Sequence, residues 1–177
     1  MTNHSYFNLS GNAKRNVLDQ KLTVKADSIA TLREDSALTG GDLIKVKETP
    51  FDFNKSKKIG DDINKKHKQL ELGNGYDHPW VLTNEEGYNI KLEDDISKRS
   101  MEVYTDRNVA VIYTTNYPEN KVLHNGKIEG KNDGICFETQ NLPIGGENYK
   151  FIEDSLIKKD EEYTTTTVFK FYWDEDR

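Results

Sequence analysis

Residues 101–115 read MEVYTDRNVAVIYTT, and their pattern decides the class of fold. Two runs, Met101–Asp106 and Asn108–Thr115, are rich in β-branched and aromatic residues, which favour strands over helices. Successive side chains of a strand point to opposite faces, so such a run can bury one face and leave the other in solvent. The stretch therefore predicts two β-strands.

The same pattern recurs on both sides of this stretch, in Lys21–Ala26, Gly134–Gln140 and Tyr163–Trp173. Turn signals separate the runs, namely Ser10-Gly11-Asn12, Gly40-Gly41-Asp42, Gly73-Asn74-Gly75, Asn125-Gly126 and Gly145-Gly146. No stretch carries the 3.6-residue period of an amphipathic helix. We therefore expect an all-β protein, an antiparallel β-sandwich, with no helix longer than about three turns.

Length and charge narrow the class of protein. The chain has 177 residues, which predicts a single domain over residues 1–177. It carries 31 acidic and 25 basic residues, a formal net charge of -6, so nucleic acid and anionic membrane surfaces are not expected partners. The hydrophobic fraction is only 34%, with a mean hydropathy of -0.86, which predicts a thin core or one that is only partly present in this chain.

Cys136 is the only cysteine, so no internal disulfide can form and a reducing compartment is expected. The sequence shows no secretory signal pattern and no apolar run of membrane-spanning length. We therefore expect a cytoplasmic protein.

Residues 54–68, NKSKKIGDDINKKHK, differ from the rest in their density of charge. A long solvated loop is the favoured interpretation. A phosphate-binding patch is the disfavoured alternative, because Asp61 and Asp62 interrupt the lysines and no aromatic residues are interspersed for base stacking.

Three short motifs carry candidate chemistry: TNHSYFNL (2–9), GYDH (75–78) and CFETQ (136–140). Each places a titratable side chain beside aromatic residues, where a half-buried group can acquire a shifted pKa and transfer protons. The four histidines form no His-x-x-x-His or Cys/His cluster, so no metal site is predicted. There is also no Gly-x-Ser-x-Gly elbow and no glycine-rich phosphate loop.

Each motif also has an ordinary structural interpretation. Strand alternation puts Glu138 on the face of Cys136, opposite Ile135 and Phe137, so it points outward or into a cleft if those two residues are core. From periodicity alone, a plain surface glutamate is the favoured interpretation. Asp77 could make a turn, and a lone histidine such as His4 is most often structural.

Together and in this order, the three motifs resemble the aldose 1-epimerases (galactose mutarotases). Further similar segments are residues 38–60, 73–82 and 101–116 and the closing stretch 160–171, so the resemblance covers essentially the whole chain. It implies a large β-sandwich. Members of the family are markedly longer, with Asn-His-Ser-Tyr near their middle. The chain therefore resembles the C-terminal part of a mutarotase-like sandwich, which predicts a fragment, a split-gene product or an excised piece that exposes surfaces meant to be covered.

The resemblance also implies an activity, the interconversion of the α and β anomers of free hexoses such as galactose and glucose. Glu138 corresponds to the general base that takes the anomeric hydroxyl proton, and His4 to the general acid that protonates the ring oxygen. The ring then opens, the C1–C2 bond rotates and the ring recloses. Asp77 corresponds to a substrate-binding residue that accepts hydrogen bonds from sugar hydroxyls, and His78 is a second substrate-binding candidate, expected to support Asp77. No cofactor or metal is implied.

The implied partners are a small-molecule aldose and either the missing N-terminal half or a second copy of the chain. In the family that half supplies an arginine and another histidine to the cleft. Two segments depart from the family pattern: Asp106–Val111 lacks the glutamine of Pro-Gly-Val-Gln, and Ile144–Asn148 replaces Asp-Ala-Ile-Asn-His.

Two rival functions stay open. Asp77 and Glu138 could form the carboxylate pair of a glycosidase. A truncated, non-catalytic carbohydrate-binding or vestigial protein is the other alternative.

Overall fold

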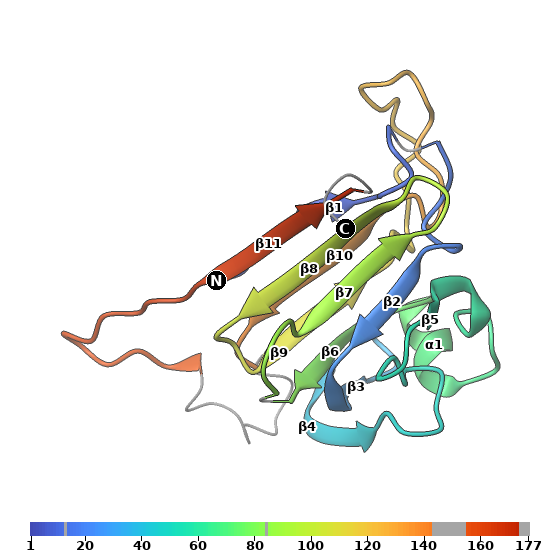
Figure 1. Cartoon of the computed structure of the whole chain (residues 1–177). Coiled ribbons are helices and arrows are strands. Elements are labelled where there is room, and N and C mark those ends of the chain that lie inside the picture. Colours follow the sequence, from blue (N-terminus) through green and yellow to red (C-terminus); the bar gives the residue numbers. More distant parts are fainter. Residues whose placement is uncertain (13, 84, 143–154, 174–177) are drawn as a thin grey trace.

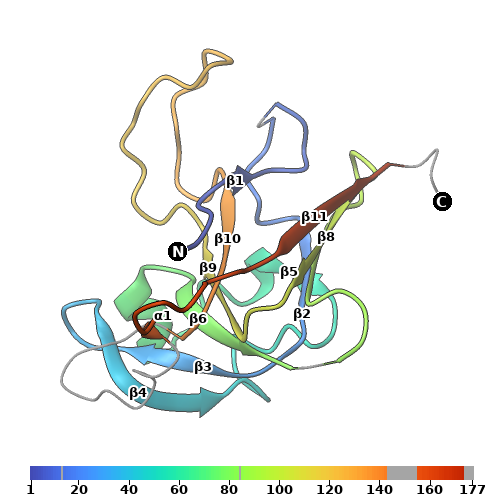
Figure 2. The same cartoon turned by 90° about the vertical axis from the view of Figure 1, so that its left-hand side faces the viewer.

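The computed structural model describes residues 1–177 except 13, 84, 143–154 and 174–177, and these residues form two antiparallel sheets (Figure 1). The six-stranded sheet has the order β1 (Tyr6–Phe7), β10 (Ile135–Gln140), β9 (Val109–Tyr113), β6 (Asp77–Leu82), β3 (Ala26–Leu32) and β4 (Leu38–Lys45). The five-stranded sheet has the order β11 (Thr167–Tyr172), β8 (Arg99–Thr105), β7 (Ile90–Asp94), β2 (Lys21–Val24) and β5 (Lys57–Lys58). Figure 2 shows the six-stranded sheet curving from β1 to β4.

The main core lies between the two sheets. The six-stranded sheet contributes Ile112 from β9 and Phe137 from β10, and the five-stranded sheet contributes Leu92 from β7 and Met101 from β8, all almost completely buried. The two helices described are short: the 3₁₀-helix η1 (Ile59–Asp61) and α1 (Lys68–Gly73). The predicted all-β antiparallel sandwich is confirmed, and the described part of the chain contains no helix longer than α1.

Residues 101–115 form the two predicted strands, one in each sheet. β8 covers most of the first run and β9 most of the second, so the short segment between them carries the chain across the sandwich. β2, β10 and β11 likewise lie within their predicted runs. β11 begins only at Thr167, later than the predicted start at Tyr163.

Among the strands longer than two residues, four were not predicted: β3, β4, β6 and β7. β3 is buried along nearly its whole length, so it lacks the alternation that marks a half-buried strand. Gly40 and Gly41 were predicted to make a turn but lie inside β4, with φ angles of 87° and 153°. The pairing of β3 with β4 shifts register between Ala30 and Leu32, so the two glycines lie in an irregular section of the sheet.

Residues 54–68 were predicted as a solvated loop, and the structure corrects this interpretation. Ile59 and Ile63 are buried in the core between the charged residues. The carboxylate of Asp62 is largely buried and pairs with both Lys57 and Lys65. The segment contains β5 and η1 and covers one end of the core.

One side of the sandwich is lined by partly exposed aromatic side chains. β1 and β11 are the outermost strands of their sheets, and the ring of Phe7 lies 5.1 Å from Phe169 and 6.1 Å from Phe171. Phe171 and Trp173 are 52% and 53% exposed. We call Phe7, Phe169, Phe171 and Trp173 the aromatic edge. Exposed apolar groups on outermost strands favour association with other chains.

We expect the isolated chain to self-associate through the aromatic edge. The double change Phe171→Ser and Trp173→Ser should shift the chain toward monomer in sedimentation velocity at micromolar concentration, because it removes the two most exposed rings of the aromatic edge. Leu43→Ser is the control, since Leu43 is 40% exposed on β4 at the opposite edge of the six-stranded sheet. Equal association of the double variant and the parent would contradict the assignment.

Candidate active site

The outer face of the six-stranded sheet, away from the core, carries a row of polar and aromatic side chains. Antiparallel register places Tyr6 opposite Cys136, Cys136 opposite Tyr113, and Tyr113 opposite Asp77. These residues therefore lie side by side on β1, β10, β9 and β6. Glu138 follows Cys136 on the same face of β10, because side chains two residues apart in a strand share a face.

His4 lies just before β1 and is held against β10 at both ring nitrogens. Its Nε2 is 3.2 Å from Oε1 of Glu138, and its Nδ1 is 3.4 Å from Sγ of Cys136. Two residues earlier, the Thr2 hydroxyl donates to the backbone carbonyl of Thr139 at 3.0 Å. Residues 2–9 and 136–140, which are distant in sequence, thus meet on one surface.

Two aromatic rings border the histidine. The ring of His4 lies 5.2 Å from Tyr6 and 6.1 Å from Tyr113. The hydroxyl of Tyr113 accepts a hydrogen bond from the backbone N–H of Tyr117 at 3.2 Å, which fixes the orientation of its ring. The side chain of His4 is 51% exposed and that of Glu138 only 15%, so the imidazole covers the carboxylate from the solvent side.

The electrostatics of the site join Asp77 to this pair. Burial raises the pKa of Asp77 to about 6, the negative charge of Glu138 adds to the rise, and the charge of His4 opposes it. Burial also raises the pKa of Glu138, again against the influence of His4. His4, Asp77 and Glu138 therefore act on one another in a single partly desolvated site.

His78, the second substrate-binding candidate, lies behind Asp77. It follows Asp77 on the opposite face of β6 and is completely buried, 4.8 Å from the ring of Phe51. Its Nδ1 accepts the backbone N–H of Asp77 at 3.2 Å, and its Nε2 lies 3.2 Å from Oε1 of Gln69. Burial lowers the pKa of His78 to about 3 and keeps the ring neutral. The buried ring therefore supports the backbone of Asp77 from the core side of β6.

Helix α1 supplies supporting residues that the sequence did not reveal. The side chain of Gln69 hydrogen-bonds the backbone of Leu32 through both its oxygen and its nitrogen, as well as meeting His78. A Cβ at Gly73 would lie 3.1 Å from the His78 ring and 3.5 Å from the Cβ of Asp77. The end of this helix thus packs directly on Asp77 and His78, and a larger residue at Gly73 would press on the His78 ring.

Cys136 and Tyr113 were also missed as site residues. Alternation along their strands could have placed each on the outer face of its own strand. Their position between Asp77 and His4 depends on the register of β10, β9 and β6, which no local pattern specifies.

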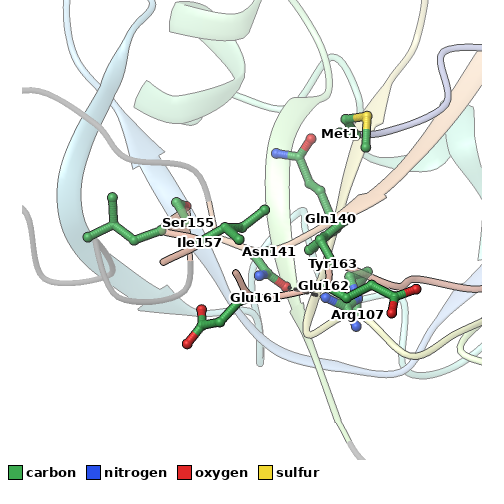
Figure 3. A pocket seen from close by; sticks show the side chains of 10 residues that line it. Met1, Arg107, Gln140, Asn141, Ser155, Ile157, Glu161, Glu162 and Tyr163 are labelled. Atoms are coloured by element: carbon green, nitrogen blue, oxygen red, sulfur yellow. Dashed lines mark hydrogen bonds between the residues drawn. The ribbon is translucent and has the colours of Figure 1, made fainter. Parts of the chain in front are cut away.

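A separate pocket opens farther along β10, beyond Glu138 (Figure 3). Its volume is about 360 Å³, and Gln140 shares the outer face of β10 with Glu138. The guanidinium of Arg107 lies 5.4 Å from the centre of the Tyr163 ring and donates to Oδ1 of Asn141 at 3.2 Å. His4 and Glu138 do not line this pocket, so it is distinct from the place where those two side chains meet.

Two further observations concern the kind of site and protein. Among the residues that the structure describes, no three His, Cys, Asp or Glu side chains are grouped so that they could hold a metal ion. The described residues also include no helix long and apolar enough to cross a membrane.

A histidine and two carboxylates on the open face of a β-sandwich define a site suited to acid–base proton transfer. Comparison with known proteins then assigns the family. The family model for aldose 1-epimerase matches residues 1–170, and the chain belongs to this family.

Individual relatives support this assignment. Human galactose mutarotase is 34% identical over 174 residues, which is 97% of this chain and 49% of the human protein. The aldose 1-epimerase of Haemophilus influenzae is 31% identical over 146 residues, 81% of this chain and 42% of its own length. The crystal structure of galactose 1-epimerase from Lactobacillus acidophilus NCFM superposes with a TM-score of 0.82 at 30% identity, over 97% of this chain and 48% of that one. The chain thus spans about half the length of the relatives it matches.

Asp77→Asn should stabilise the protein at neutral pH. The ordinary pKa of this carboxyl is 3.8, and in the folded state it rises to about 6, so the folded chain binds the proton more tightly than the unfolded chain. Its contribution to stability therefore falls as the pH rises from about 4 to 6, and ionised Asp77 costs on the order of 1–3 kcal/mol above that range.

Urea unfolding of the parent and Asp77→Asn at pH 4 and pH 7.5 measures this effect. We expect the variant to be more stable at pH 7.5 and close to the parent at pH 4. The control is Asp27→Asn, because the side chain of Asp27 is 71% exposed on β3. A stability difference that does not change with pH would refute the account.

Proposed function

We propose that this chain carries the acid–base part of an aldose 1-epimerase site and acts in the interconversion of the α and β anomers of free hexoses. The observation that carries the proposal is the approach of His4 Nε2 to Glu138 Oε1 at 3.2 Å on the outer face of β10. The printed names of the relatives, galactose mutarotase and aldose 1-epimerase, support the same reaction class.

The chemistry requires two proton transfers at neighbouring oxygens of one sugar. Glu138, as carboxylate, takes the proton of the anomeric hydroxyl, while His4, as imidazolium, gives its Nε2 proton to the ring oxygen. The bond between C1 and the ring oxygen breaks as the carbonyl at C1 forms. Rotation about C1–C2 presents the other face of the carbonyl, and return of both protons closes the opposite anomer. Two positioned titratable groups are sufficient for this sequence.

The direct contact between His4 and Glu138 has a consequence for binding. In the sugar-free structure the two groups pair with each other, so the sugar must enter between them and take over their hydrogen bonds. The exposed position of His4 suits this movement, because the ring can swing toward solvent while Glu138 stays on β10. Asp77 then accepts hydrogen bonds from sugar hydroxyls at the other side of the row.

The same contact favours an epimerase over a glycosidase. A retaining or inverting glycosidase needs two carboxyl groups facing the scissile bond. Here the partner of the Glu138 carboxylate is the imidazole of His4 and not a second carboxyl group. A sugar-binding protein without turnover is the second candidate, and it is favoured by one observation: the chain spans about half the length of its relatives.

We further propose that the aromatic edge takes a β-rich polypeptide that corresponds to the unmatched half of the relatives, with a second copy of the chain as the alternative partner. Phe171 and Trp173 lie on this edge, and it borders β1, next to His4. A partner bound here would cover the exposed rings of the aromatic edge and would also lie close to His4. We place the protein in the cytoplasm, because its single thiol is buried and unpaired with another cysteine.

Glu138→Gln should lower catalysed mutarotation on the order of 10²–10⁴-fold in a complete protein, because the amide keeps the shape but cannot accept the proton. Polarimetry of freshly dissolved α-galactose and α-glucose gives the rate above the buffer reaction. The matched control is Glu71→Gln on the exposed surface of α1. Equal rates for Glu138→Gln and the parent would remove Glu138 as the base.

The isolated chain should be a poor catalyst, and a polypeptide corresponding to the unmatched half should raise the rate. Holding a sugar between acid and base contributes several kcal/mol, up to roughly 7–11 in ideal cases, and an incomplete cleft forfeits part of it. The rate is measured for the chain alone and after the half is added. Full activity from a monodisperse monomer of this chain would refute the need for a partner, whereas sugar binding without turnover in both samples would support the non-catalytic alternative.

A further inference from the structure

Cys136 occupies a special position in the site that acid–base chemistry alone does not explain. Its thiol lies on the same face of β10 as Glu138, two residues away, and its Sγ is 3.4 Å from Nδ1 of His4. Cys136 and Glu138 therefore hold the two nitrogens of one imidazole ring. Cys136 itself is completely buried, whereas the His4 side chain is half-exposed, so the ring rests on a fixed thiol.

We propose that Cys136 is a positioning residue for His4, and that it suits this role because a thiol can both donate and accept a hydrogen bond. The catalytic role of His4 in this proposal rests on the proposed function. The contact between Sγ of Cys136 and Nδ1 of His4 does not depend on it.

The histidine of an epimerase must pass through different protonation states, and each presents a different Nδ1. While His4 is an imidazolium, Nδ1 carries a hydrogen and donates to Sγ. After Nε2 has given its proton to the ring oxygen, Nδ1 keeps its hydrogen and still donates to Sγ. In the resting neutral site Nε2 carries the hydrogen toward the Glu138 carboxylate, so Nδ1 has a free lone pair and accepts the S–H. A carboxylate or a carbonyl at this place could only accept, and would leave Nδ1 of the resting neutral state without a donor.

The surroundings keep Cys136 a thiol throughout. Burial raises its pKa to about 12, and the negative charges of Glu138 and Asp77 add to the rise. The titratable groups that face the thiol are Glu138 on its own strand, His4 and Tyr6 from the N-terminal segment, Tyr113 on β9 and Asp77 on β6. None of them is a lysine or an arginine, so no permanently charged cation faces the thiol.

Raman spectroscopy tests the contact without requiring turnover. Cys136 is the only cysteine, so its S–H stretching band is a single, assignable feature of the intact chain. The band should move to lower wavenumber as the pH rises and His4 becomes neutral, because the S–H begins to donate to Nδ1. His4→Phe should abolish this movement, and His124→Phe, which changes an exposed histidine outside the site, should leave it intact. A band that does not respond to pH, or responds equally in His4→Phe, would overturn the proposal.

Turnover gives a second and separate readout in whichever preparation catalyses mutarotation. Cys136→Ser keeps a group that donates and accepts, and should retain most of kcat. Cys136→Ala removes the partner of Nδ1 and should lower kcat by about tenfold or more with a smaller change in KM, because the ring is no longer held in the reacting orientation. Equal kcat for the alanine and serine variants would overturn the proposal. If no preparation catalyses the reaction, the proposed function fails while the Raman result still decides on the contact.

Discussion

The alternation of side chains along β10 is the constraint on which both the core and the site depend. Ile135 and Phe137 point into the sandwich, and Cys136 and Glu138 point to the outer face. The same six residues thus anchor one wall of the core and present the candidate base. A slip of one residue in the pairing of β10 with β9 would bury the carboxylate and expose the phenylalanine, so packing of the core enforces the placement of the chemistry.

Register extends this coupling across four strands. The row from Tyr6 through Cys136 and Tyr113 to Asp77 exists because three neighbouring antiparallel pairings share one alignment. Asp77 is then fixed from behind, where buried His78 holds its backbone N–H and Gln69 of α1 holds His78. The polar face of the sheet is therefore supported by the core face and by a helix beyond it. This support holds Asp77 in place although its ionised, partly desolvated carboxylate lowers stability.

Much of this arrangement could be predicted from the sequence, and the failures have physical causes. Strands with one buried face, such as β9 and β10, show an alternation of core and outward-facing residues in the sequence. The face on which Glu138 lies followed from this alternation. β3 could not be recognised in this way because both of its faces are covered, and β6 contains Pro79, which argues against a central strand. Residues 54–68 were misjudged because two buried isoleucines are surrounded by solvated lysines. The altered segment at 144–148 lies outside the described residues. For His78 the motif indicated importance but not direction, since neighbouring residues of a strand face opposite ways.

Because β1 has only two residues, the two sides of the site are held with different firmness. The candidate base lies on a strand paired on both sides, whereas the candidate acid precedes a strand of two residues at the edge of the sheet. Short edge elements open at a lower free energy than strands in the middle of a sheet. The candidate base is therefore held more firmly than the candidate acid, because local opening of β1 would displace His4 without unfolding the sandwich. Sequence changes around β1 can thus tune the chemistry while the core stays intact.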